Sequence, residues 1–213
     1  MSAREEILGR IHSALADAPV APTVQRTYRR EADLAGEALV EMLVDRLVDY
    51  KANVDVVVSA DLPATLERRL AAAESYVVPP GLADSPWWGT AALEADPRRV
   101  VDAVDAPLSV TDLDTTSAVV TSSAVSVAES GTIILDGSAE MGRRAISLVP
   151  DHHVCVVPGS TIVQLLPEAL PRLDITRPQT WISGPSATSD IELERVEGVH
   201  GPRDLDVVIV TDL

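Results

Sequence analysis

Three short segments of the chain combine reactive side chains with glycine, which lets a backbone turn with positive φ or approach a ligand closely. In the first segment, Glu129, Ser130, Gly131 and Thr132 bring a carboxylate, hydroxyls and a glycine together immediately ahead of an apolar run. A carboxylate in such a place can act as an acid, a base or a nucleophile. An ordinary turn has the same composition, so this segment alone leaves both interpretations open.

The second segment follows an apolar run at residues 180–182, which it breaks at Gly184. It then supplies the hydroxyls of Ser186 and Thr188 and the carboxylate of Asp190. Free backbone N–H groups in such a loop can bind an anion. In open α/β sheets ligands bind beyond the carboxyl ends of strands, which is where this segment is expected to lie. The competing interpretation is a Ser/Thr-rich loop in which the aspartate caps a turn.

The third segment, residues 198–203, has the sequence Gly-Val-His-Gly-Pro-Arg and precedes the last apolar run. His200 titrates near neutral pH and is a candidate acid or base. Arg203 is a candidate clamp for a carboxylate or a phosphate. Alternatively, this arginine only balances the charges of Asp204 and Asp206.

Several common active-site motifs are absent, among them G-x-G-x-x-G, H-E-x-x-H, C-x-x-C and G-x-S-x-G. Residues 137–142 have the glycine spacing of a phosphate loop but continue with two arginines, so we interpret them as a turn into a helix. His152 and His153 are expected to point to opposite faces of a strand, where they cannot easily share a metal. Cys155 lies in an apolar run and is expected to be a buried, inert thiol. The sequence predicts no metal site.

Length and charge set broad limits on the function. The 213 residues suffice for one sizeable core, and the formal net charge is −16. This charge repels nucleic acid and anionic lipid, so any anionic ligand must be met by local cations and backbone N–H groups. The chain has one cysteine, no apolar signal segment and no apolar run near the roughly 20 residues of a membrane span. We expect a cytoplasmic protein without a membrane span.

Residues 1–33 are predicted to form an N-terminal helix and a linker. Ser2 and Glu5 have the spacing of a capping box, and apolar residues then recur at helical intervals up to Leu15. The following stretch contains prolines and arginines but little apolar periodicity, which is typical of a linker. The domain is therefore expected to span residues 34–213.

This second region alternates between helical and extended patterns. A helix over residues 34–50 has an apolar stripe wide enough for burial against a sheet. Strands at 54–58 and 76–78 flank an Ala-rich helix, and such a βαβ unit requires parallel strands. Further strands are expected at residues 118–120, 132–135, 154–157, 180–182 and 207–210. Runs this apolar suit strands covered by helices on both faces, so the fold class is α/β with a mainly parallel sheet.

Taken together, the three segments resemble the lactate-utilisation (LUD) domain family, and within it the C-type subunits LutC/YkgG. The resemblance is carried by Ala-Glu-Ser-Gly-Thr-Ile at 128–133, Gly-Pro-Ser-x-Thr-x-Asp-Ile-Glu at 184–192 and Gly-Val-His-Gly-Pro-Arg at 198–203. These motifs occur in the family's order and spacing, and the resemblance extends from about residue 34 to the C-terminus. It implies the three-layer α/β/α arrangement of the NagB/RpiA/CoA-transferase-like fold.

The resemblance also implies a part in oxidising L-lactate to pyruvate, together with partner subunits that hold iron–sulfur centres. With one cysteine this chain cannot hold such a cluster alone, so it would be the cluster-free subunit. The sequence shows no cofactor of its own, and a small anionic metabolite is a possible ligand. Ser130 and Ala187 depart from the family's usual threonine and arginine. The missing cation leaves Arg203 as the best candidate for a carboxylate clamp.

Two other functions remain open. In a stand-alone CoA-transferase- or isomerase-like enzyme, Glu129 would form a covalent acyl intermediate, by analogy of fold alone. In a non-catalytic module, the glycine-marked loops would only bind a ligand. The leading hypothesis gives catalytic roles to Glu129 and His200. The residues expected to bind the substrate or an anion are Ser130, Gly131, Thr132, Gly184, Ser186, Thr188, Asp190 and Arg203.

Overall fold

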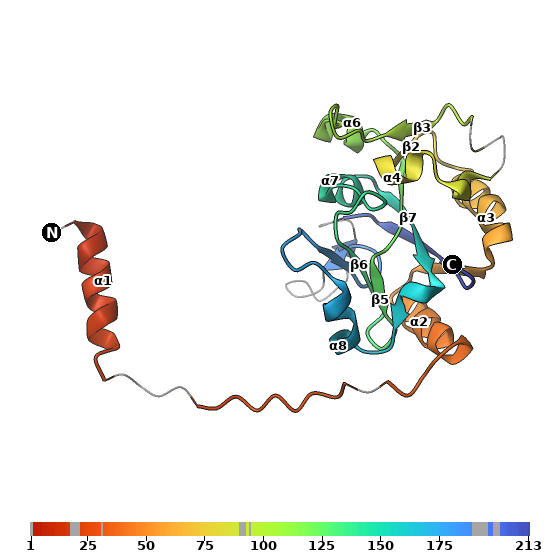
Figure 1. Cartoon of the computed structure of the whole chain (residues 1–213). Helices are drawn as coiled ribbons and strands as arrows, with labels where there is room; N and C mark the ends of the chain where they lie inside the picture. The colour runs from red at the N-terminus through yellow and green to blue at the C-terminus, as the bar shows by residue number, and fades with distance from the viewer. Residues whose placement is uncertain are drawn as a thin grey trace.

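The computed structural model describes residues 2–17, 22–30, 32–89, 93, 95–188, 196–197 and 201–213 (Figure 1). Its helices are α1 (Ala3–Ala14), α2 (Glu37–Asp49), α3 (Leu62–Arg69), α4 (Pro80–Ala83), α6 (Val110–Asp114), α7 (Arg144–Leu148) and α8 (Leu166–Ala169). Its strands are β1 (Asn53–Val57), β2 (Tyr76–Val78), β3 (Arg99–Val101), β4 (Ala118–Thr121), β5 (Val125–Val127), β6 (Thr132–Leu135), β7 (His152–Pro158), β8 (Ile162–Val163), β9 (Thr180–Ile182), β10 (Ala187–Thr188), β11 (Val196–Glu197) and β12 (Asp204–Val210).

The domain is built on a central six-stranded sheet with the order β1-β12-β7-β4-β2-β3, in which all neighbouring strands pair in parallel. The runs at 154–157 and 207–210 lie in its middle strands and are fully buried. Their lack of alternation reflects burial on both faces, because apolar residues are needed on each side of such a strand. The expected strand, helix and strand at residues 54–78 are present as β1, α3 and β2, although β12, β7 and β4 lie between the two strands in the sheet. The α/β class with a mainly parallel sheet is confirmed.

The two faces of this central sheet are covered differently. One face packs against α3 and the buried ring of Trp88, whose centroid lies 6.3 Å from that of Tyr76. The opposite face packs against α2, through Leu43 and Leu47, and against a second sheet. Part of this face, around Val119, is covered by α6 and α7. The layers are therefore helix, sheet and a mixed layer of helices and short strands.

The second sheet has the order β8-β5-β6-β9, with antiparallel pairing of β6 to both β5 and β9 (Figure 1). The runs at 132–135 and 180–182 belong to this sheet, although their apolar character suggested helix-covered strands like the central ones. Ile133 faces the cluster under α2, whereas Ile134 faces the cluster under α8. Both faces of β6 are thus buried, so its sequence does not reveal which sheet it joins.

The N-terminal helix α1 carries the expected capping box, in which the backbone N–H of Ser2 donates to Glu5 Oε2 at 2.7 Å. None of its residues is buried, and Figure 1 shows it outside the domain. The chain reaches the domain where the backbone N–H groups of Asp33 and Leu34 both donate to Gln164 Oε1 at 2.8 Å. In the part of the chain described here, no helix is long and apolar enough to cross a membrane.

Candidate functional site

A cavity of about 240 Å³ lies between β7 and β12 of the central sheet, β9 of the second sheet, and α7. We call it the β7–β9 cavity. It lies past the carboxyl end of β9, but His153 and Leu205 place it near the amino ends of β7 and β12. Its lining residues are Ser147, Leu148, His153, Thr180, Trp181, Ile182, Ser183, Gly184, Pro185, Ser186, Gly201, Pro202 and Leu205.

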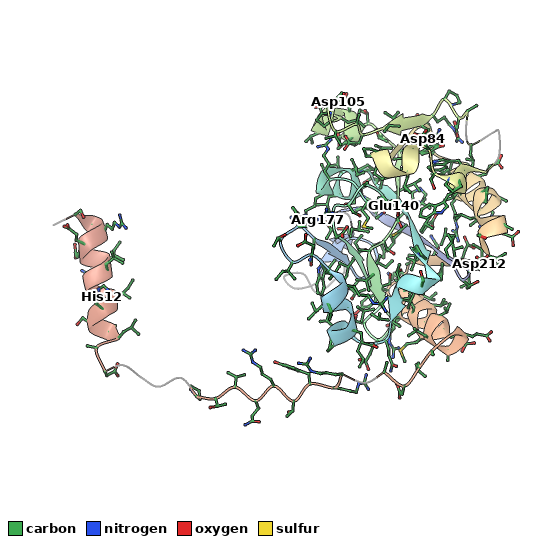
Figure 2. All side chains as sticks on the ribbon, viewed as in Figure 1. His12, Asp84, Asp105, Glu140, Arg177 and Asp212 are labelled. Carbon is green, nitrogen blue, oxygen red and sulfur yellow. The ribbon has the colours of Figure 1, made fainter. Side chains whose placement is uncertain are left out.

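The described lining of the cavity holds no aspartate, glutamate, lysine or arginine. It combines hydroxyls with apolar side chains, which is the usual composition of a site for a small ligand. Among the described residues, the acidic side chains lie away from this lining, and Figure 2 shows Asp84, Asp105 and Asp212 at separate places on the domain. The described lining of the cavity is therefore uncharged in a strongly acidic protein.

Two of the glycine-marked segments meet at this cavity. The backbone N–H of Ser186, in the second segment, donates to the carbonyl oxygen of Pro202, in the third, at 2.8 Å. Gly201 lies beside this contact, where an added Cβ would be 3.7 Å from the Ser186 Cβ. Residues 184–186 and 201–202 therefore form one continuous part of the wall.

The first segment joins the site through a chain of hydroxyl groups. The Thr132 hydroxyl lies 2.8 Å from the Ser130 hydroxyl and 2.8 Å from that of Ser183. Ser183 lines the cavity, whereas Thr132 stands behind it, largely buried, and supports it. The structure thus brings parts of all three segments to one place.

Two glycines hold these loops close to helix α2. Gly131 has φ 60° and Gly184 has φ 90°, a region that favours glycine. A Cβ on Gly131 would lie 2.8 Å from the Cβ of Arg46, and one on Gly184 would lie 2.6 Å from the Cβ of Tyr50. Arg46 and Tyr50 are one helical turn apart, so the end of α2 supports both loops.

His153 is a cavity residue that the sequence analysis did not select. It is fully buried, and its Nε2 lies 2.8 Å from the hydroxyl oxygen of Thr121 at the end of β4. Burial, with a smaller contribution from the neighbouring His152, lowers the pKa of His153 to about 3, so the ring is neutral at physiological pH. A polar residue at an inward position of an apolar strand was the signal in the sequence, because such a group needs a hydrogen-bond partner.

Other selected residues lie outside the cavity. Glu129 is half exposed and forms an ion pair with Arg29 of the linker. Arg203 is mostly exposed, and it lies 3.6 Å from Asp151 rather than pairing with Asp204 or Asp206.

Three further candidates from the second and third segments cannot be placed by their side chains. Thr188 takes part through its backbone in the two-residue pairing of β10 with β11. Asp190 and His200 lie outside the described residues. Their roles stay predictions.

The two adjacent histidines point to opposite faces of β7, as predicted. His152 Nε2 lies 2.9 Å from Asp206 Oδ2, while His153 faces Thr121. Cys155 is fully buried, as predicted, and burial raises the pKa of its thiol to about 12, which disfavours the reactive thiolate. Among the described residues, no group of three or more His, Cys, Asp or Glu side chains could hold a metal ion.

Comparisons with known proteins agree with the resemblance found in the motifs. A family model described as the LUD domain matches residues 40–210, which include all three segments. A protein named Lactate utilization protein C from Deinococcus radiodurans is 42% identical over 214 residues, covering 98% of this chain and 95% of that protein. A protein of the same name from Bacillus subtilis is 38% identical over 101 residues, covering 44% of this chain and 42% of the relative.

A solved structure also resembles this chain. The crystal structure of a DUF162 family protein from Deinococcus radiodurans matches it with a TM-score of 0.69 and 36% sequence identity. The match covers 83% of this chain and 99% of the other. The α/β architecture is therefore shared with a protein whose structure was determined by crystallography.

Proposed function

The chain belongs to the LUD domain family, and we propose that it is the cluster-free component of a system that oxidises L-lactate to pyruvate. The observation that carries this proposal is the meeting of family-type motifs at the β7–β9 cavity. Ser183 and Ser186 of the second segment line it together with Gly201 of the third, and Ser183 contacts Thr132 of the first. The described lining of this site is small and uncharged. A relative that aligns with 98% of the chain is named Lactate utilization protein C.

The proposal assigns the electron transfer to partner proteins. Oxidation of a hydroxy acid to a keto acid releases two electrons, which iron–sulfur centres can accept. Such centres need several cysteine thiolates, whereas this chain has the single thiol of Cys155. Because that thiol is buried and its pKa is raised to about 12, it does not supply a thiolate. The chain would bind or position a small molecule while iron–sulfur partners carry the electrons.

Within this proposal, Arg203 and His200, which adjoin lining residues in the sequence, would act at the mouth of the cavity. Arg203 follows Pro202, which lines the cavity, and its exposed guanidinium would clamp a carboxylate. His200 precedes Gly201 and would exchange a proton with the ligand. Glu129 and the remaining anion-binding candidates stay part of the same proposal: Ser130, Gly131, Thr132, Gly184, Ser186, Thr188 and Asp190.

Affinity purification of the tagged full-length chain from cells grown on L-lactate, followed by mass spectrometry, tests the proposal. We expect two iron–sulfur proteins to co-elute in stoichiometric amounts. The same purification from cells grown on glucose, with the chain expressed from a plasmid, is the control for non-specific capture. If the chain elutes alone under both conditions, the subunit proposal is wrong, and the stand-alone enzyme becomes the leading alternative.

A further inference from the structure

A residue that lines the cavity has a buried nitrogen whose role the fold does not explain. His153 is fully buried in β7 and lines the cavity. Its Nε2 lies 2.8 Å from the Thr121 hydroxyl, but its Nδ1 is buried without a hydrogen-bond partner among the described residues. Buried polar atoms are nearly always hydrogen-bonded, so an unmatched one beside a cavity indicates a group that binds there.

The neighbouring hydrogen bonds favour one position for the proton of the neutral ring. The Thr121 hydroxyl donates to Cys155 Sγ at 3.8 Å, and the Cys155 thiol donates to the carbonyl oxygen of Ser122 at 3.9 Å. A hydroxyl has one proton, so when Thr121 donates to sulfur it accepts from Nε2 of the histidine ring. In this tautomer Nε2 of His153 carries the proton and Nδ1 presents a lone pair.

This lone pair stays available over the physiological pH range. Burial keeps the imidazole neutral, and no described lining residue carries a charge that would favour the protonated ring. A neutral imidazole with a proton on Nε2 accepts a hydrogen bond at Nδ1 but cannot donate one there. The cavity is thus able to distinguish a ligand that offers a donor from one that offers only acceptors.

We propose that Nδ1 of His153 accepts a hydrogen bond from the hydroxyl of a small 2-hydroxy acid, while the Ser183 hydroxyl, which can accept from Thr132, donates to its carboxylate. Leu148 and Leu205 supply apolar surface for the rest of the molecule. The corresponding keto acid would place its carbonyl oxygen next to the Nδ1 lone pair. Both atoms are acceptors, so no hydrogen bond would form between them. We expect the keto form to bind about 10-fold more weakly, as the loss of one buried hydrogen bond implies.

The Nδ1 acceptor rests on the burial and the hydrogen bonds of His153, whereas the choice of hydroxy acid rests on the proposed function. Four probes distinguish the effect of the ligand's hydroxyl on binding from the effect of its carboxylate charge. They are L-lactate, pyruvate and the methyl ester of each. The two lactate compounds carry a hydroxyl, the two pyruvate compounds do not, and the esters lack the negative charge. Comparison across the set therefore isolates the contribution of the hydroxyl.

Nitrogen-15 NMR of the histidine rings in the full-length chain is the direct measurement. In the free protein we expect His153 to show a protonated Nε2 and an unprotonated Nδ1. L-Lactate and methyl L-lactate should each shift the Nδ1 signal, with dissociation constants about 10-fold lower than those of their keto counterparts. The keto compounds should leave the Nδ1 signal unchanged.

Two matched variants provide the controls. His153→Gln keeps an N–H for Thr121 but has no counterpart of Nδ1, so it should bind the lactate and pyruvate compounds equally. His152→Gln, its neighbour on the opposite face, should retain the difference. The inference is overturned if Nδ1 is protonated in the free protein, if no probe shifts its signal, or if all four shift it alike. If one of these results is obtained while the iron–sulfur partners still co-purify with the chain, this inference is wrong but the proposed function is not contradicted.

Discussion

His152 and His153 are neighbours in β7, yet they lie in opposite chemical surroundings on the two faces of the central sheet. His152 belongs to a charged group near the amino ends of β1, β7 and β12, which we call the Asp206 cluster. In it, Asp206 accepts hydrogen bonds from His152 at 2.9 Å, Asn53 at 2.9 Å and Arg69 at 3.2 Å. His153 instead faces a cavity whose described lining is uncharged.

The two faces of the sheet differ in whether their polar groups have hydrogen-bond partners. Burial acts to raise the pKa of Asp206, but the hydrogen bonds from His152 and Asn53, together with the charge of Arg69, lower it overall. Every donor and acceptor named in that cluster has a partner, which is typical of a group that stabilises the fold. Nδ1 of His153 has no partner in the described structure, and this is the observation behind the proposed contact with a ligand.

Removing the central carboxylate should have the largest effect on stability. Asp206→Leu leaves Arg69 close to Asp55 but takes the acceptor from His152 and Asn53, so we expect the free energy of unfolding to fall by about 3–5 kcal/mol. Chemical denaturation measures this loss. Asp204→Leu is the matched control in the same strand, because Asp204 is exposed and should change stability little. Equal losses in both variants would contradict the assigned role of the Asp206 cluster.

An alanine in place of Gly184 should destabilise the wall of the β7–β9 cavity. Gly184→Ala forces alanine into φ 90° and places its Cβ 2.6 Å from the Tyr50 Cβ, so we expect a loss of about 2–3 kcal/mol. Gly201→Ala is the control in the same wall, where the nearest atoms would lie 3.7 Å away. Thermal or chemical unfolding of the two variants checks this, and a Gly201→Ala loss as large as that of Gly184→Ala would be the contrary result.

The buried neutral histidine predicts a pH dependence of stability. The unfolded chain binds a proton at residue 153 below pH 6.5, whereas the folded chain does so only near pH 3. The unfolded state therefore binds more protons in this window, and the free energy of unfolding should fall as the pH falls, by about 1–2 kcal/mol between pH 6.5 and 5. His153→Gln should remove most of this slope, and an unchanged slope in the variant would show that His153 is not its source.

The smallest effect is expected from the hydroxyl chain behind the cavity. Thr132→Val keeps the side-chain shape but removes contacts to the hydroxyls of Ser130 and Ser183, so we expect a loss of about 1 kcal/mol. Ser130→Ala removes one of these contacts and should cost less. Denaturation curves in parallel measure both losses, and the opposite order would mean that Thr132 does not connect the segments.

Features set by local sequence were predictable. The capping box of Ser2 and Glu5, the apolar strands of the central sheet and the helix α2 all follow from spacing and propensity over a few residues. The second sheet was not predictable in this way. Its strand β5 is short and has Ser126 at its centre, so it lacks a clear apolar run. Its position depends on pairing with β6 and β8.

The candidate site was predictable only in part, for a related reason. The three glycine-marked segments were visible in the sequence, and the structure brings Ser186 and Pro202 within one hydrogen bond. The partner of His153 could not be found from the sequence, because Thr121 lies 32 residues away on another strand. Likewise, the ion pair of Arg29 with Glu129 joins positions 100 residues apart. Contacts of this kind depend on the assembled fold.

The most direct test of the account is growth on L-lactate of cells whose only copy of the chain carries His153→Gln or His152→Gln. Each glutamine keeps the N–H that replaces Nε2, so both proteins should accumulate to normal levels on glucose, which immunoblotting verifies. The account predicts that the His153 variant fails to grow on L-lactate while the His152 variant grows normally. Normal growth of the His153 variant would contradict the claim that the β7–β9 cavity serves lactate utilisation.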